Sequence, residues 1–299
     1  TDFTGPMTSW PELAPYAQSV SLPKTNLTLF TFQAGDPAAP PALLIHGLGD
    51  EADTWRHLIP ALAMRQRVVA LDLPGFGRSD QPAIDYTPDF LQRTLLELMD
   101  VLGLDDVLLI GNSLGAMLAQ SLAPKAPERI RGLALLDGTL VAQGSRTNLP
   151  MLLFAMPKLG EYLYTRLRKN PDAAYDSLRP FYFDLDALPQ ADQDFLYTRV
   201  NQRVWSDDQR RAYFSVLRNV GPWRRKLQGG LPKLLEMITT PTLAIWGEAD
   251  QVMPVANGRA LAEMQAGAQL ITIARAGHLP QQERPDAVLD ALRIGGLIG

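Results

Sequence analysis

Short continuous apolar runs recur along the chain, each bounded by turn residues. This pattern is typical of parallel strands that are covered on both faces. Six such buried strands are predicted, namely ALLIH (Ala42–His46), RVVALDL (Arg67–Leu73), VLLIG (Val107–Gly111), IRGLALLD (Ile130–Asp137), TLAIWG (Thr242–Gly247) and QLITIA (Gln269–Ala274). Two earlier segments, Gln18–Pro23 and Leu27–Gln33, also read as strands, the second because it alternates as LTLFTF.

Helical patterns separate these strands. They cover Pro88–Leu102, Ser113–Ala126, Pro254–Gln265 and Pro285–Ile294. Strand–helix alternation implies right-handed crossovers and predicts an α/β fold with a mostly parallel, doubly wound sheet. In such sheets the active site lies at the carboxyl ends of the strands, so residues that directly follow a strand are the first candidates for chemistry.

The alternation breaks between Thr139 and Met237. This segment carries many aromatic residues, no convincing buried strand, and three helical stretches at Met151–Lys169, Ala191–Trp205 and Asp207–Val220. A helical excursion between two strands is expected to cover the strand ends. We therefore predict a core domain formed by residues 1–138 and 236–299, with a helical cap, or lid, at residues 139–235.

Composition excludes several classes of protein. The net charge is −4 with no long run of either sign, which argues against a nucleic-acid partner. The chain has no cysteine, so disulfides, thiol catalysis and thiolate metal sites are excluded. The apolar stretch MLLFAM is broken by Pro157, far short of the roughly 20 residues of a membrane span. No signal peptide is visible, although a processed start before Thr1 stays open, and we expect a cytoplasmic location.

The stretch LLIGNSLGAML carries the strongest chemical signal. Ser113 stands where a predicted strand meets a predicted helix, between Gly111 and Gly115. G-x-S-x-G in a strand–turn–helix context is a nucleophile elbow, a sharp turn that exposes the serine hydroxyl, whereas the five-residue pattern alone arises by chance. Ser113 is therefore the candidate nucleophile.

A serine hydroxyl needs a base within hydrogen-bonding reach, and the chain has three histidines. His278 follows the strand QLITIA and is the preferred base, whereas His57 reads as a surface or packing residue. Asp250, directly after TLAIWG, is the preferred acid to orient the imidazole. Asp137 also ends a strand and is the serious alternative. The order serine, acid, histidine is that of the α/β-hydrolase fold.

Acyl transfer also requires backbone donors for an oxyanion. The N–H of Leu114 is one candidate, because it opens the helix after the elbow. The N–H of Leu48 is the other, because it lies in HGLG, after His46, where glycines at 47 and 49 allow close approach to a substrate. Alone, HGLG would read as a plain turn.

Other chemistries find no support in the sequence. LPGFGRSD lacks the third glycine of a dinucleotide-binding loop, and no G-x-x-x-x-G-K-[ST] occurs. Three scattered histidines do not form a metal motif. We expect neither a cofactor nor a metal.

The ordered motifs HGLG, DLPGFGRSD, GNSLG, GEAD and AGHLPQQERP make the chain resemble the α/β-hydrolase superfamily, in particular its capped esterase, lipase and C–C hydrolase branch. The resemblance covers nearly the whole chain apart from the cap. It implies a triad of Ser113, Asp250 and His278, with the amides of Leu48 and Leu114 as oxyanion hole. Epoxide hydrolases and haloalkane dehalogenases of the superfamily carry aspartate in place of Ser113, which counts against both activities.

The first functional hypothesis is a hydrolase of carboxylic esters with apolar, short-to-medium acyl groups. The alternatives are a C–C hydrolase, thioesterase, lactonase or perhydrolase with the same triad, or a ligand receptor on the same fold. The partner is expected to be a small apolar molecule, and the chain a monomer or homodimer. The substrate pocket is predicted to include Gly47, Asn112, Phe154, Met156, Trp205, Trp223 and Leu279, and other apolar residues of the cap are Leu149, Met151, Leu152, Tyr162, Phe181 and Tyr182.

Overall fold

The computed structural model describes residues 2–143 and 153–299. Its centre is an eight-stranded sheet with the order β1-β2-β4-β3-β5-β6-β7-β8. The strands are β1 (Ala17–Leu22), β2 (Leu27–Ala34), β3 (Pro41–Ile45), β4 (Arg67–Leu71), β5 (Val107–Asn112), β6 (Ile130–Leu136), β7 (Thr242–Gly247) and β8 (Ala268–Ile273). All eight strands predicted from the apolar pattern are present, with ends shifted by up to two residues.

The sheet is mostly parallel. Strands β4, β3, β5, β6, β7 and β8 pair in parallel, whereas β2 pairs antiparallel with both β1 and β4. The carboxyl ends of β3, β5, β6, β7 and β8 therefore meet at one edge of the sheet, which is where the predicted site residues follow in sequence. The predicted α/β fold with a doubly wound sheet is confirmed.

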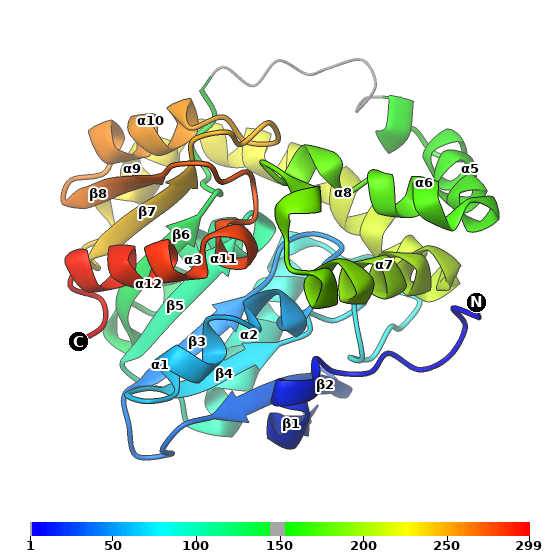
Figure 1. Cartoon of the computed structure of the whole chain (residues 1–299). Coiled ribbons are helices and arrows are strands. Elements are labelled where there is room, and N and C mark those ends of the chain that lie inside the picture. Colours follow the sequence, from blue (N-terminus) through cyan, green and yellow to red (C-terminus); the bar gives the residue numbers. More distant parts are fainter. Residues whose placement is uncertain (1, 144–152) are drawn as a thin grey trace.

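Two helical layers cover the sheet (Figure 1). Successive residues of a strand point to opposite faces of the sheet. In β3, Leu43 and Ile45 pack on one face, and Ala42 and Leu44 pack on the other. The first face is covered by α2 (Pro88–Leu102), α3 (Leu114–Leu122) and α10 (Ala256–Met264). The second is covered by α1 (Ile59–Leu62) and α12 (Pro285–Ile294). Both faces of the central strands are thus covered, as their continuous apolar sequences require.

The strand β8 differs from its prediction. Its sequence was expected to form a fully buried strand, but only Ile273 of its six residues is buried. The reason is its place at the edge of the sheet, beside β7 alone. An apolar run does not by itself distinguish an edge strand from a central one.

A helical region is inserted between β6 and β7 (Figure 1). It contains α5 (Leu159–Arg166), α6 (Pro171–Asp176), α7 (Gln190–Trp205), α8 (Asp207–Gln228) and α9 (Leu231–Glu236). The helix predicted to end at Val220 continues through Pro222 to Gln228. The helix predicted over Met151–Lys169 begins outside the described residues, where Leu149, Met151 and Leu152 also lie. Its described part is interrupted at residues 156–158, where Lys158 has a φ of 68°, and continues as α5, which ends at Arg166 and is followed by a 3-10 turn at Leu167–Lys169. In the described part of the region no strand occurs, as predicted.

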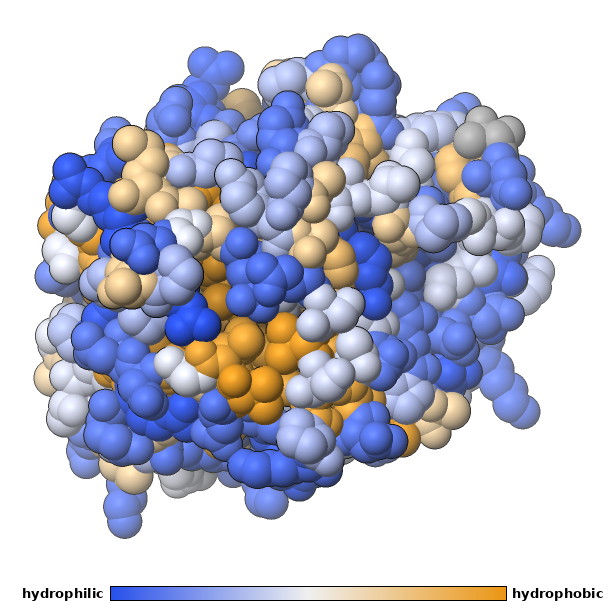
Figure 2. All heavy atoms as spheres, turned by 90° about the horizontal axis from the view of Figure 1, so that it is seen from below, coloured by the Kyte–Doolittle hydropathy of each residue, from blue (hydrophilic) through white to orange (hydrophobic). Residues whose placement is uncertain are grey.

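Polar side chains cover most of the surface in Figure 2, around one central apolar area. Among the described helices, none combines the length and the apolar character needed to cross a bilayer.

Candidate active site

Ser113 lies in the turn from β5 to α3, with φ 53° and ψ −113°. A positive φ costs a residue with a side chain about 1–3 kcal/mol and is kept only where the surrounding structure imposes it. Tight packing imposes it here, because a Cβ on Gly115 would lie 2.0 Å from the carbonyl oxygen of Ile45. Ser113 is partly exposed while Asn112 and Leu114 on either side are buried. The turn therefore has the strained, accessible serine that the sequence predicts.

His278 and Asp250 are in direct contact. The imidazole Nδ1 lies 2.8 Å from Asp250 Oδ2, and both side chains are buried. The other carboxylate oxygen, Oδ1, accepts hydrogen bonds from the N–H groups of Val252 (2.7 Å) and Met253 (2.9 Å). Three hydrogen bonds thus fix the Asp250 carboxylate against the ring. Of the two aspartates that the sequence left open, Asp250 is the one bonded to His278.

Asp137, the alternative acid, lies directly behind this pair. Its Oδ1 accepts from the N–H of Gly247 at 2.8 Å, and the side chain is fully buried. Ligand atoms of Asp137, Asp250 and His278 all lie within 4.8 Å of one another. Two nitrogen or oxygen ligands of one zinc ion at 2.0–2.1 Å in tetrahedral geometry would be about 3.3 Å apart, so the 2.8 Å contact between Nδ1 and Oδ2 is a hydrogen bond rather than a shared metal site.

The His278 loop is anchored to the serine turn and to the inserted region. Asn112 Nδ2 donates to the carbonyl oxygen of His278 at 3.0 Å, which ties the histidine to the residue before Ser113. The N–H of His278 donates to the carbonyl oxygen of Phe181 at 2.8 Å. Asn112, predicted as a pocket residue, therefore has its amide engaged in holding the loop.

Glu283 completes this anchoring. Its carboxylate accepts from the N–H of Gly277 (2.7 Å) and from the N–H of Phe183 (2.8 Å), so one side chain joins the histidine loop to the inserted region. Burial raises the pKa of Glu283. Sequence reasoning missed this residue, because nothing in the motif QQERP distinguishes a buried glutamate from a solvated one.

The HGLG loop lies against the serine. A Cβ on Gly47 would be 3.3 Å from the Cβ of Ser113, so the loop backbone passes directly beside it. His46 shapes this loop: the N–H of Leu73 donates to its Nε2 at 2.8 Å, and its Nδ1 lies 2.7 Å from the carbonyl oxygen of Gly47. Since Nε2 accepts, Nδ1 carries the proton, and burial lowers the pKa of the ring. His46 is thus a neutral structural histidine.

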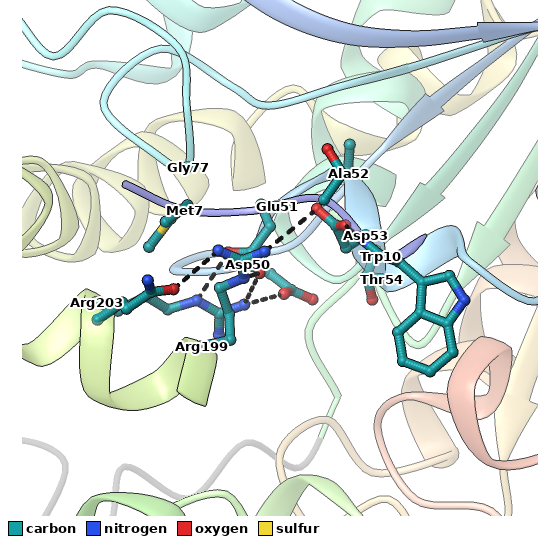
Figure 3. Close-up of polar contacts among 12 residues, drawn as sticks. Met7, Trp10, Asp50, Glu51, Ala52, Asp53, Thr54, Gly77, Arg199 and Arg203 are labelled. Carbon is teal, nitrogen blue, oxygen red and sulfur yellow. Dashed lines mark hydrogen bonds and ion pairs between the residues drawn. The ribbon is translucent and has the colours of Figure 1, made fainter. Parts of the chain in front are cut away.

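Charged residues hold the next part of the loop (Figure 3). Arg203 on α7 contacts Asp50 at 2.7 Å and both oxygens of Glu51, at 2.7 and 2.9 Å. Arg199, one turn earlier, contacts Glu51 at 2.9 Å and donates to the carbonyl oxygen of Thr8. We call Asp50, Glu51, Arg199 and Arg203 the cap–loop ion network. Burial by itself raises the pKa of Glu51, but the two arginines outweigh it and hold that pKa at about 2.

An aromatic cluster of the inserted region contacts the same loop through Tyr213. The Tyr213 ring on α8 covers Gly49, since a Cβ there would lie 2.9 Å from Tyr213 Cδ2. The ring packs on those of Phe154 and Tyr164, with centroids 6.3 and 5.7 Å apart. Burial raises the pKa of Tyr164 to about 12, so its phenol is neutral at physiological pH. Phe154 was predicted to line the pocket, whereas Tyr213 was not singled out by sequence.

The other predicted pocket residues lie in different surroundings. Trp223 is half-buried against the sheet core, and Leu279 packs with Tyr182. Met156 is 46% exposed. Trp205 is 40% exposed and lines a hollow of about 230 Å³ together with N-terminal residues including Phe3 and Met7. The pocket role of these residues stays a prediction. His57, expected at the surface or in packing, contacts Asp192 of α7 at 2.8 Å.

Comparison with known proteins agrees with this architecture. A family model described as alpha/beta hydrolase fold matches residues 40–285, and the chain belongs to that family. Among curated relatives, a 2-hydroxy-6-oxononadienedioate/2-hydroxy-6-oxononatrienedioate hydrolase of Dechloromonas aromatica is 30% identical over 251 residues, covering 82% of each chain. Epoxide hydrolase 4 of Mus musculus is 29% identical over 294 residues, covering 90% of this chain and 76% of the relative.

Among solved structures, that of a bacterial membrane phospholipase A superposes with a TM-score of 0.71 at 26% identity. The match covers 93% of this chain and 86% of the other. The relatives thus share the fold while their names cover C–C bond, epoxide and ester hydrolysis.

Proposed function

We propose that the chain is a serine hydrolase that cleaves carboxylic esters with apolar, short-to-medium acyl groups through an acyl-enzyme on Ser113. The observation that carries the proposal is the 2.8 Å hydrogen bond between His278 Nδ1 and the buried Asp250 carboxylate, on a loop tied to the residue beside a strained, accessible serine. A nucleophile, a base and an orienting acid are the minimum set for covalent acyl transfer.

In the proposed mechanism, His278 Nε2 takes the proton of the Ser113 hydroxyl while Oγ attacks the ester carbonyl. Asp250 keeps the proton of the neutral imidazole on Nδ1 and stabilises the imidazolium that forms. The tetrahedral oxyanion accepts hydrogen bonds from the N–H groups of Leu114 and Leu48. The first is free because the N–H groups of a helix's first turn have no intrahelical acceptor.

Collapse of this intermediate transfers the proton from His278 to the departing alcohol and leaves Ser113 acylated. A water molecule then gives its proton to His278 and attacks the acyl carbon. The acid leaves and the proton returns to Ser113. The cycle needs only water besides the ester, and no cofactor.

The preference for apolar acyl groups rests on Tyr213, which lies against Gly49 of the loop, and on the aromatic rings packed with it, those of Phe154, Tyr164 and Phe214. Pockets for small molecules are mostly apolar with a few placed polar groups. The phospholipase A similarity is compatible with an ester substrate that carries an acyl chain.

A C–C hydrolase is the second candidate, favoured by the relative from Dechloromonas aromatica. The substrate in that protein's name is a dicarboxylate, whose charges cationic side chains in the site would favour. Arg199 and Arg203, the arginines beside the HGLG loop, are already paired with Glu51 and Asp50. Because the two arginines beside the loop are paired, we favour ester hydrolysis. Thioesters, lactones and a perhydrolase reaction would use the same triad.

Two further functions are less well supported. Epoxide hydrolysis uses an aspartate nucleophile in this superfamily, and this chain has Ser113 at that position. A ligand receptor on the same fold would not need the His278–Asp250 pair.

The test compares wild type with Ser113→Ala on p-nitrophenyl acetate, butyrate and octanoate. It also includes thioesters with the same acyl groups, lactones, and a vinylogous diketone. We expect the wild type to hydrolyse the esters and the variant to fall to the background rate. Equal rates for both proteins would refute the proposal. A kcat/KM for the diketone at least 100-fold above every ester would assign the C–C reaction instead. A fluorophosphonate adduct on the peptide that contains Ser113, found by mass spectrometry, identifies the nucleophile directly.

A further inference from the structure

A second buried carboxyl group stands behind the proposed triad. Asp137 directly follows β6, is fully buried, and has a φ of 47°. Its N–H donates to the carbonyl oxygen of Ile245 at 3.0 Å, and its Oδ1 accepts from the N–H of Gly247 at 2.8 Å. Two hydrogen bonds to β7, one from the backbone and one to the side chain, therefore hold Asp137 in place.

The other oxygen of Asp137 is unsatisfied. Within residues 2–143 and 153–299, Asp137 Oδ2 has no hydrogen-bond partner. The side chain nevertheless lies close to the pair, because ligand atoms of Asp137, Asp250 and His278 all lie within 4.8 Å of one another. A buried, unpartnered carboxylate oxygen is costly, and two buried carboxylates at this distance repel each other. A proton on Asp137 removes both penalties, because a carboxylic acid is neutral and can donate to the neighbouring carboxylate.

Which of the two carboxyl groups holds the proton follows from their partners. Asp250 accepts from two backbone N–H groups and from His278, and these three donors favour its anionic form. Asp137 accepts from one N–H alone. Burial raises the pKa of Asp137 well above its ordinary range, and the negative charge of Asp250 raises it further. The ionisable groups that face Asp137 are Asp250, His278 and, further away, Glu283.

We propose that Asp137 is a protonated positioning residue whose carboxyl O–H donates a hydrogen bond to Asp250 and holds that carboxylate, as an anion, against His278. The proton on Asp137 is a property of the fold, whereas its effect on turnover rests on the proposed function. Asp137 acts through Asp250 and touches no substrate.

Two variants separate the protonated form from the ionised one. Asp137→Asn keeps a donor toward Asp250 and an acceptor for Gly247, so it mimics a protonated acid but not a carboxylate. Asp137→Ala removes the donor. Asp290→Asn changes an aspartate on α12 whose side chain is 67% exposed, and serves as the control.

The first readout needs no activity. Infrared difference spectra at pH 7 of wild type against Asp137→Asn should contain the C=O band of a protonated carboxyl, which the same difference for Asp290→Asn should lack. Proton NMR of the hydrogen-bonded His278 Nδ1–H should give the same resonance in wild type and Asp137→Asn, and a shifted or exchange-broadened one in Asp137→Ala. Absence of the carboxylic acid band, or an equal resonance in all three proteins, would overturn the proposal.

The second readout is ester hydrolysis. We expect kcat of Asp137→Asn within about threefold of wild type, and kcat of Asp137→Ala at least about tenfold lower with KM nearly unchanged, because only the orientation of His278 is affected. An Asp137→Asn variant as impaired as Asp137→Ala would contradict the assigned proton. If wild type cleaves no ester, the proposed function fails, and the infrared and NMR readouts still decide the state of Asp137. If Asp137→Ala does not fold, the infrared band and the activity of Asp137→Asn decide it.

Discussion

Arg203 on α7 places its Nη2 atom 2.7 Å from the Asp50 carboxylate, and the same guanidinium contacts both oxygens of Glu51. Asp50 comes two residues after Leu48, the proposed oxyanion donor. Arg203 belongs to the inserted helical region, so this ion pair joins that region to the loop that carries the proposed donor. We expect this ion pair to help fix where the HGLG loop lies relative to Ser113.

Removing this contact should impair turnover more than substrate binding. We expect Arg203→Met to lower kcat by about 10- to 100-fold, because an oxyanion donor displaced by about 1 Å loses much of its effect in the transition state alone. KM should stay within about threefold. Steady-state kinetics on a p-nitrophenyl ester measure both constants.

The matched control is Arg211→Met on α8. Arg211 pairs with Asp208 at the surface, where an ion pair contributes under about 1 kcal/mol, so its kcat should equal that of wild type. An Arg203→Met variant that unfolds at a lower temperature but keeps the wild-type kcat would mean that the cap–loop ion network supports the fold alone.

The same network should make the free energy of unfolding depend on pH in the acidic range. The folded pKa of Glu51, about 2, lies below its ordinary 4.5. A carboxylate whose pKa is lowered by folding stabilises the folded protein. That stabilisation is fully present above the pKa of the group in the unfolded chain, and it is lost as the pH falls through its pKa in the folded protein. The stability that Glu51 contributes should therefore be lost as the pH falls from 4.5 to about 2. The difference between the two pKa values corresponds to about 3 kcal/mol in the free energy of unfolding.

Urea unfolding of wild type and Glu51→Gln across this window measures the effect. At pH 7 the variant should be less stable by about 3 kcal/mol, since Arg199 and Arg203 lose a buried partner. The difference between the two proteins should shrink as the pH falls toward 2. A constant difference at every pH would show that the charge of Glu51 is not what stabilises the network.

The strand pattern and the serine turn could be predicted because each depends on local sequence. A buried parallel strand must be continuously apolar, and an elbow must have glycine where a Cβ would strike backbone, as at Gly115. Asp250 could be preferred but not distinguished from Asp137, since both directly follow strands that the sheet places side by side. Only the 2.8 Å contact with His278 separates them.

The residues that position the site could not be predicted. Arg203, Glu283 and Tyr213 act through contacts with segments far away in sequence, and nothing local marks an arginine or a glutamate as buried. The pocket predictions relied on residue type alone. They therefore named Trp205, whose pocket role stays a prediction, and did not name Tyr213, which lies against Gly49.

The acid of the proposed triad can be tested by a change of one atom. Asp250→Asn keeps the size of the side chain but presents an amide that favours the wrong imidazole tautomer. We expect kcat to fall by roughly 10³- to 10⁴-fold. Glu248→Gln, two residues earlier in the same turn and exposed, should stay within twofold of wild type. Comparable losses in both variants would point to a general effect of the turn.

The elbow makes a prediction about stability. Gly115→Ala would place a Cβ 2.0 Å from the carbonyl oxygen of Ile45, on backbone that cannot yield. We expect a loss of at least about 1–3 kcal/mol by denaturant unfolding, the usual cost of overpacking. Gly229→Ala has no atom within 4 Å of its new Cβ and should change stability by less than about 0.5 kcal/mol. Equal stability of the two variants would contradict the close crossing of β3 and α3.

Tyr213 gives a prediction about chain-length preference. Its ring lies over Gly49 and packs on Phe154 and Tyr164, so it limits the space beside the proposed oxyanion hole. Tyr213→Ala should raise kcat/KM for p-nitrophenyl octanoate relative to acetate by about tenfold, because a longer acyl chain can fill the vacated volume. Tyr213→Phe retains the ring and should keep the wild-type ratio, which makes it the control for the hydroxyl. If Tyr213→Phe shifts the ratio as much as Tyr213→Ala, the phenol rather than the ring sets the preference. If neither variant changes it, the acyl chain lies elsewhere.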